Sequence, residues 1–115
     1  MVYLLETKLL ETKSIYFALS SIYGIGNKKS LKICKKLGFS VNLKVQHLSE
    51  EQVVQILKVI EMSNFMVTSE LKKMQQLIIK HLISIKSYRG LRRIKGLPVR
   101  GQRTHTNAKT ARKIK

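Results

Sequence analysis

The sequence predicts an all-α protein, with a small helical domain over residues 1–87 and a long, extended basic tail over residues 88–115. Three observations support this class. Apolar residues recur at helical spacing, helix start and stop signals separate the apolar runs, and no segment alternates apolar and polar residues as a half-buried strand would. A length of 115 residues suits one small domain and a tail.

Two short helices are expected near the N-terminus, over residues 14–21 and 27–37. The first is predicted by apolar residues at i, i+4 and i+7, which are Ile15, Leu19 and Ile22. The second is expected to bury the face formed by Leu31, Cys34 and Leu37. Gly38 should end this second helix, because glycine adopts the left-handed conformation without steric penalty.

A third helix should begin after Ser49. Ser49 and Gln52 have the spacing of a capping box, and Leu48 and Val53 that of a hydrophobic staple. Its predicted buried face consists of Val53, Ile56, Leu57 and Ile60.

A fourth and longest helix is expected over residues 69–84, followed by a short basic helical turn over residues 88–95. The apolar stripe of the long helix comprises Leu71, Met74, Ile78, Leu82 and Ile85. Four glycine or proline residues then occur within twelve positions, which indicates an extended chain. The twenty residues from Gly96 onward would reach about 65 Å if fully extended.

Positive charge is the dominant compositional feature. The chain has 23 Lys and Arg residues against 6 acidic ones, a net charge of +17. Residues 71–115 hold fourteen of the Lys and Arg residues and no Asp or Glu, and all six arginines lie between Arg89 and Arg112. Such a field favours a polyanionic partner, and nucleic acid, above all RNA, fits best.

The residues that commonly support catalysis or metal binding are few and scattered. Cys34 is the only cysteine, so a disulfide within the chain and a cysteine-based zinc site are excluded. His47, His81 and His105 have no ligand spacing, and no catalytic set of side chains can be assembled. We therefore expect no enzyme activity, no metal and no cofactor. Apolar runs interrupted by Lys and Glu also argue against a membrane partner.

Two segments carry side chains suited to RNA. Gly24, Ile25 and Gly26 join two helices, and Asn27 and Lys28 follow at the start of the second, where backbone N–H groups can meet a phosphate. A tight helix–helix turn that simply needs glycine is an equally good interpretation of this segment. Beside Tyr88, the forked guanidinium groups of arginine can bind phosphate and stack on bases, as lysine cannot. These arginines are Arg89, Arg92 and Arg93.

Three motifs, in this order, resemble the bacterial-type small-subunit ribosomal protein thirteen family. They are Ala18-Leu-Ser-Ser-Ile-Tyr-Gly-Ile-Gly26, Tyr88-Arg-Gly-Leu-Arg92 and Gly96-Leu-Pro-Val-Arg-Gly-Gln-Arg-Thr104 with Thr106-Asn-Ala108. The resemblance implies a helix–two-turns–helix unit followed by a tail. It also implies a structural role in the head of the small ribosomal subunit, bound to the 3′ major domain of its rRNA.

The resemblance also implies particular partners and contact residues. The expected partners are rRNA, tRNA near the P site, small-subunit protein nineteen and, across an intersubunit bridge, large-subunit protein five. Besides residues 24–28 and the three arginines above, the expected rRNA-binding residues are Arg100, Gln102, Arg103, Thr104, Thr106 and Asn107. The residues expected nearest tRNA are Lys109, Arg112, Lys113 and Lys115.

The expected location is the mitochondrial matrix, with a bacterial cytoplasm as the alternative. The first residues lack the features of a signal or transit peptide, and Ile and Lys are abundant, which together favour an organelle-encoded chain. Two other functions compete with a ribosomal one. A DNA-repair module also uses helix–two-turns–helix units, but this chain has no catalytic set. A cationic membrane-active protein would lack the glutamates present at residues 50, 51 and 61.

Overall fold

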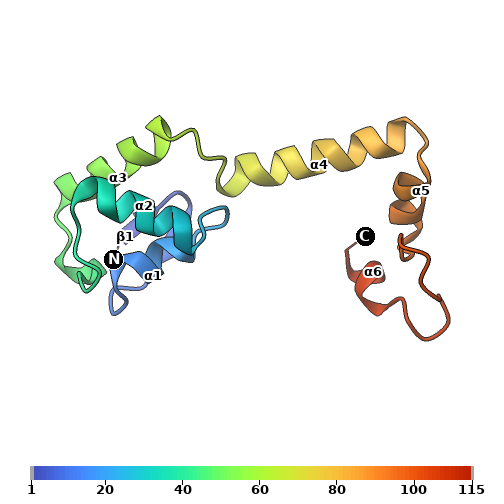
Figure 1. The fold of residues 1–115 in the computed structure, drawn as a ribbon, viewed down its shortest axis with the longest axis horizontal. Helices are drawn as coiled ribbons and strands as arrows, with labels where there is room; N and C mark the ends of the chain where they lie inside the picture. The colour runs from blue at the N-terminus through green and yellow to red at the C-terminus, as the bar shows by residue number, and fades with distance from the viewer. Residues whose placement is uncertain (1, 115) are drawn as a thin grey trace. The chain divides into compact units, whose positions relative to one another are not determined.

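A computed structural model of the chain describes residues 2–114 and divides the chain into two compact units, residues 1–71 and 72–115. Within residues 2–114 there are six α-helices, one short 3-10 helix and one two-stranded sheet (Figure 1). The all-helical class predicted from the sequence is confirmed. The sequence predicts a different boundary at residue 87, between the helical domain and the tail expected to thread through RNA. That boundary stays a prediction.

The chain begins with a hairpin that the sequence did not predict. Strand β1 (Val2–Leu4) pairs antiparallel with β2 (Thr7–Leu9), with Val2 opposite Leu9. Its turn residues Leu5 and Glu6 both have positive φ, 48° and 64°. Two-residue hairpin turns need this conformation but normally contain Asn or Gly, so this turn has no recognisable local signature.

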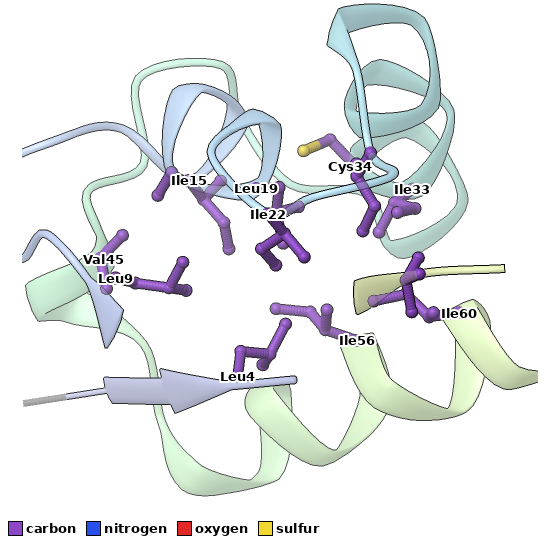
Figure 2. Packing of buried hydrophobic residues seen from close by; sticks show 13 residues of the cluster. Leu4, Leu9, Ile15, Leu19, Ile22, Ile33, Cys34, Val45, Ile56 and Ile60 are labelled. Atoms are coloured by element: carbon purple, nitrogen blue, oxygen red, sulfur yellow. The ribbon is translucent and has the colours of Figure 1, made fainter. Parts of the chain in front are cut away.

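The first unit has a single apolar core (Figure 2). Side chains from the hairpin, α1 (Ile15–Ser20), α2 (Asn27–Leu37), the 3-10 helix η1 (Val45–His47) and α3 (Glu50–Met62) meet there. The fully buried members include Leu4, Leu9, Ile15, Leu19, Ile22, Ile33, Val45 and Ile56. Burial of these side chains is the main force that holds the short helices together, since helices of this length are marginal alone.

Helix α2 has its predicted bounds, and of its predicted buried face Cys34 is buried and Leu37 packs partly buried against the core. Ser30, Ile33 and Cys34 are buried, whereas Leu31 is 37% exposed. A serine in the buried stripe concealed the true periodicity, so the predicted burial of Leu31 was wrong. Gly38 ends the helix with a φ of 68°, as expected.

Helix α3 begins as the sequence predicts. The Ser49 hydroxyl accepts from the Gln52 backbone N–H at 3.3 Å, and the Ser49 N–H donates to Gln52 Oε1 at 3.1 Å. The capping box is therefore confirmed. Ile56 and Ile60 are buried, and Val53 and Leu57 pack partly buried against the core.

Helix α4 (Thr68–Ser84) has the predicted length, but none of its residues is buried. Met74, Ile78 and Ile85 from the predicted apolar stripe are 39%, 55% and 57% exposed. Much of the predicted apolar stripe is therefore exposed. Periodicity indicates an apolar face but does not say what covers it.

The second unit contains α5 (Tyr88–Lys95) and α6 (Lys109–Lys113). Residues 97–107 have no helix or strand, as expected of a tail. They are not fully extended, because the backbone bends at Gly101 and Thr106, which have φ values of 71° and 56°. Ala108 is only 4% exposed, and α6 follows it (Figure 1). The tail thus turns back on itself and spans less than the length of about 65 Å expected for a fully extended chain. No local sequence pattern indicates this turn.

Candidate nucleic-acid interface

The two glycines of the α1–α2 turn differ in what they do. Gly24 has a φ of 99°, and a Cβ there would lie 2.8 Å from the Met66 carbonyl oxygen. Gly26 is the N-cap of α2 with a φ of −101°, and a Cβ there would meet nothing within 4 Å. Gly24 is therefore needed by the fold itself. No contact within the described residues explains Gly26, whose open surroundings leave room for a partner.

The other residues of the turn also divide between core and surface. Ile25 is 3% exposed and belongs to the core, so only its backbone can contact a ligand. Asn27 and Lys28 are exposed at the N-terminus of α2. Free N–H groups and the helix dipole at this end favour an anion.

Lys29, which was not among the predicted contact residues, supports the turn from within. Its Nζ donates to the Gly24 carbonyl at 3.0 Å and lies 4.8 Å from the centre of the Phe65 ring. A hydrogen bond and a cation–π contact both hold this ammonium group against the protein. We interpret Lys29 as a structural residue, in contrast to its exposed neighbour Lys28.

A lysine face on α2 extends the interface beyond the predicted residues. An open hollow on this face is lined by Lys28, Leu31, Lys32, Lys35 and Lys36. Four ammonium groups around one hollow repel one another and favour an anionic ligand. Lys32, Lys35 and Lys36 are not among the predicted contact residues. They follow Lys28 at i+4, i+7 and i+8, and this helical spacing was the signal that pointed to a shared face.

The three arginines of helix α5 differ in exposure and in their contacts within the protein. Ser87 caps the helix by accepting from the Gly90 N–H at 3.1 Å, and Arg89 is exposed. Arg92 is half-buried, donates from Nε to the Pro98 carbonyl at 3.1 Å, and lies 5.7 Å from the centre of the Tyr88 ring. Arg93 is also half-buried. Arg92 thus holds the loop after α5, in addition to any contact with RNA.

The predicted contact residues of the 97–107 segment are exposed. The Asn107 side-chain amide donates to the Arg103 carbonyl at 3.2 Å, and the Thr106 hydroxyl donates to the His105 carbonyl at 2.7 Å. These bonds fix the backbone and leave the guanidinium groups of Arg100 and Arg103 facing solvent. The exposed polar side chains of this segment include Arg100, Gln102, Arg103, Thr104, Thr106 and Asn107.

The three cations of α6 that were expected nearest tRNA, Lys109, Arg112 and Lys113, are exposed. Lys115 lies outside the described residues. Residues 24–28 belong to the first unit, and all predicted contacts from Arg89 onward belong to the second. Each group is therefore a separate candidate surface.

Other kinds of site find no support in residues 2–114. No group of three or more His, Cys, Asp or Glu side chains in this part of the chain is arranged to hold a metal ion. None of the helices described is both long and apolar enough to cross a membrane. Cys34 is buried, and burial raises the pKa of its thiol, which disfavours the reactive thiolate.

Fold and surface together define a small, strongly basic helical protein with cationic faces. Comparison with known proteins gives a more particular assignment. Residues 3–110 match the family described as ribosomal protein S13/S18, and the chain belongs to this family. It is a structural constituent of the ribosome and not an enzyme.

Curated relatives match nearly the whole chain. The small ribosomal subunit protein uS13m of Marchantia polymorpha is 52% identical over 115 residues, which cover 100% of this chain and 95% of the relative. The uS13m protein of Daucus carota is 43% identical over 113 residues, covering 98% and 97%. The bacterial uS13 of Borrelia duttonii is 47% identical over 98 residues, covering 85% and 78%. The mitochondrial relatives support a location in the mitochondrial ribosome, as expected.

Proposed function

We propose that this protein binds small-subunit rRNA in the head of the subunit, within the 3′ major domain. The observation that carries the proposal is charge segregation. Residues 72–115 contain fourteen Lys and Arg residues and no Asp or Glu, so this unit has no side-chain carboxylate of its own to neutralise them. Phosphates of a folded RNA supply the missing negative charge, and released counterions favour the complex.

Two surfaces would carry the binding. In the first unit, the open backbone at Gly26, the N-terminus of α2 and Lys28 receive a phosphate, and the lysine face of α2 extends this contact. In the second unit, Arg89, Arg92 and Arg93 on α5 and the exposed segment from Arg100 to Asn107 thread between RNA strands. Helix α5 and this segment both belong to the RNA-threading tail, residues 88–115.

We further infer contacts with neighbours in the assembled ribosome. Family membership supports small-subunit protein nineteen as a neighbour, large-subunit protein five as the partner in an intersubunit bridge, and tRNA near the P site. The exposed cations of α6, Lys109, Arg112 and Lys113, together with Lys115, would meet tRNA. A chain with Lys109, Arg112 and Lys113 all changed to alanine tests this part. It keeps the backbone of the pocket wall, so it should enter small subunits normally but weaken tRNA binding at the P site.

Co-sedimentation of the tagged chain from mitochondrial lysates after a high-salt wash tests rRNA binding. Wild-type protein should remain in the small-subunit and monosome peaks. A chain carrying both Arg100→Ala and Arg103→Ala should be stripped at lower salt, because it neutralises fewer phosphates. Lys58→Ala, which removes an exposed cation from α3 outside the proposed interface, is the matched control. Recovery of wild-type protein only at the top of the gradient would contradict the proposal.

A further inference from the structure

In the second unit the tail turns back toward α5, and this creates a pocket of about 450 Å³ between α5, the following loop and α6. One wall is apolar and includes Leu97, Pro98 and Ala111, while Arg93, Gln102 and Asn107 supply polar groups around it. Its volume lies in the range of sites that bind small organic ligands, about 300–1,000 Å³.

The walls of this pocket are held by contacts within the protein. Gly96 ends α5 with a φ of 67°, which turns the chain into the loop. Arg92 Nε then fixes the carbonyl of Pro98, whose ring is buried. On the opposite side, the Asn107 amide is bound to the Arg103 carbonyl, so its side-chain oxygen stays available as an acceptor. The pocket therefore has an apolar wall held by contacts within the protein and, in Asn107, one polar group that is oriented before any ligand enters.

The chemistry of the lining matches an unstacked nucleobase better than a phosphate. A phosphate site needs several cations or converging N–H groups, whereas Arg93 is the only charged residue in the lining among residues 2–114. A base offers an apolar face and an edge with both donors and acceptors. Leu97, Pro98 and Ala111 can cover the face, and a guanidinium group can stack on it. The carboxamides of Gln102 and Asn107 can pair with the edge, because each amide group both donates and accepts.

We propose that this pocket receives a single unstacked base of the bound RNA, while Arg100 and Arg103 bind the phosphates on either side. The proposal rests on the rRNA-binding function and adds to it a base-recognition site. It assigns Gln102 to recognition of a base edge, a role distinct from phosphate binding by the neighbouring arginines.

Equilibrium binding of the full chain to RNA of the small-subunit 3′ domain tests the proposal, with each unpaired nucleotide in turn made abasic. One abasic position should weaken wild-type binding by about five- to one-hundred-fold, the effect of losing one stacked base. Ala111→Phe, which fills the pocket, should weaken binding of intact RNA, and the same abasic position should then have no further effect. Gln102→Ala should act in the same direction.

Salt dependence separates this site from phosphate contacts. Gln102→Ala and Ala111→Phe change no charge, so they should leave the slope of log affinity against log salt unaltered. Arg100→Ala should lower that slope by about one. If Arg100→Ala weakens binding but the pocket variants and all abasic positions do not, the base pocket is refuted and rRNA binding stands.

Two further results would overturn the proposal in different ways. Normal RNA affinity of Ala111→Phe combined with poor incorporation into subunits would mean that the pocket holds a side chain of a protein neighbour. No binding of wild-type protein to the RNA would refute rRNA binding itself, and the base site with it.

Discussion

Gly90 in α5 lies directly against the backbone of Leu82 in α4. A Cβ on Gly90 would be 2.5 Å from the Leu82 carbonyl oxygen and 2.7 Å from its carbonyl carbon. The same carbonyl accepts from the Ser87 hydroxyl at 2.8 Å and from the Ser87 backbone N–H at 3.3 Å. This close approach sets the corner from which α5 and its arginines follow α4, so a glycine inside a basic motif serves the fold.

Gly90→Ala should therefore loosen the α4–α5 corner. Alanine favours a helix over glycine by about 1 kcal/mol, but the added methyl overlaps backbone atoms, and overpacking typically destabilises by about 1–3 kcal/mol. We expect the overlap to win, because backbone atoms yield less readily than a flexible side chain. Hydrogen exchange of the Leu91 N–H, which bonds to the Ser87 carbonyl, should speed up. Lys95→Ala on the same helix is the control, and unchanged exchange in Gly90→Ala would contradict the assignment.

The two glycines of the α1–α2 turn should separate folding from binding. Gly24→Ala places a side chain at a φ of 99° and against the Met66 carbonyl, so the free energy of unfolding should fall by roughly 1–3 kcal/mol. Gly26→Ser should change it by no more than about 0.5 kcal/mol, because the site is open and serine is a good N-cap. Urea denaturation followed by circular dichroism measures both. If RNA must approach this backbone closely, Gly26→Ser should nevertheless weaken RNA binding, and undiminished affinity would remove Gly26 from the interface.

Local signals predicted the helices well, because each depends on neighbouring residues. The capping box at Ser49 and the left-handed cap at Gly38 appear where their sequence signatures stand. The hairpin escaped prediction because Leu5 and Glu6 adopt positive φ without glycine or asparagine. The burial of Ser30 and Ile33 on α2 escaped prediction because a serine interrupts the apolar pattern.

Features that depend on distant residues were harder to predict. The exposed basic segment was foreseeable from charge alone, but the need for Gly24 arises from Met66, more than forty positions away in the sequence. Likewise, the pocket beside Arg93 exists only because residues 108–114 return to α5, and no local propensity signals that return. Sequence therefore indicates which residues are available for RNA, and tertiary packing decides which of them are committed to the fold.

Arg92→Lys should distinguish the structural role of Arg92 from its charge. Lysine keeps the positive charge but lacks the Nε–H that reaches the Pro98 carbonyl and the planar group near Tyr88. We expect the loop over residues 97–107 to become more accessible to protease, while the salt slope of RNA binding stays unchanged. Arg89→Lys, at an exposed position of the same helix, is the matched control. Equal protease sensitivity of the two variants would show that the Pro98 contact does not hold the loop.

Cys34 should report the integrity of the first unit. Its side chain is 3% exposed, and burial raises the pKa of the thiol above its ordinary value of 9.0. Near that ordinary value the unfolded chain releases the proton while the folded chain keeps it, so the free energy of unfolding should fall as pH rises above about 9. Cys34→Ala should remove this part of the pH dependence.

Alkylation of Cys34 by iodoacetamide at neutral pH should be far slower in the native chain than in urea. A Cys34→Ala, Ser40→Cys chain, with its thiol at an exposed position, should react quickly in both conditions. Rapid alkylation of native Cys34 would mean that α2 opens readily from the core.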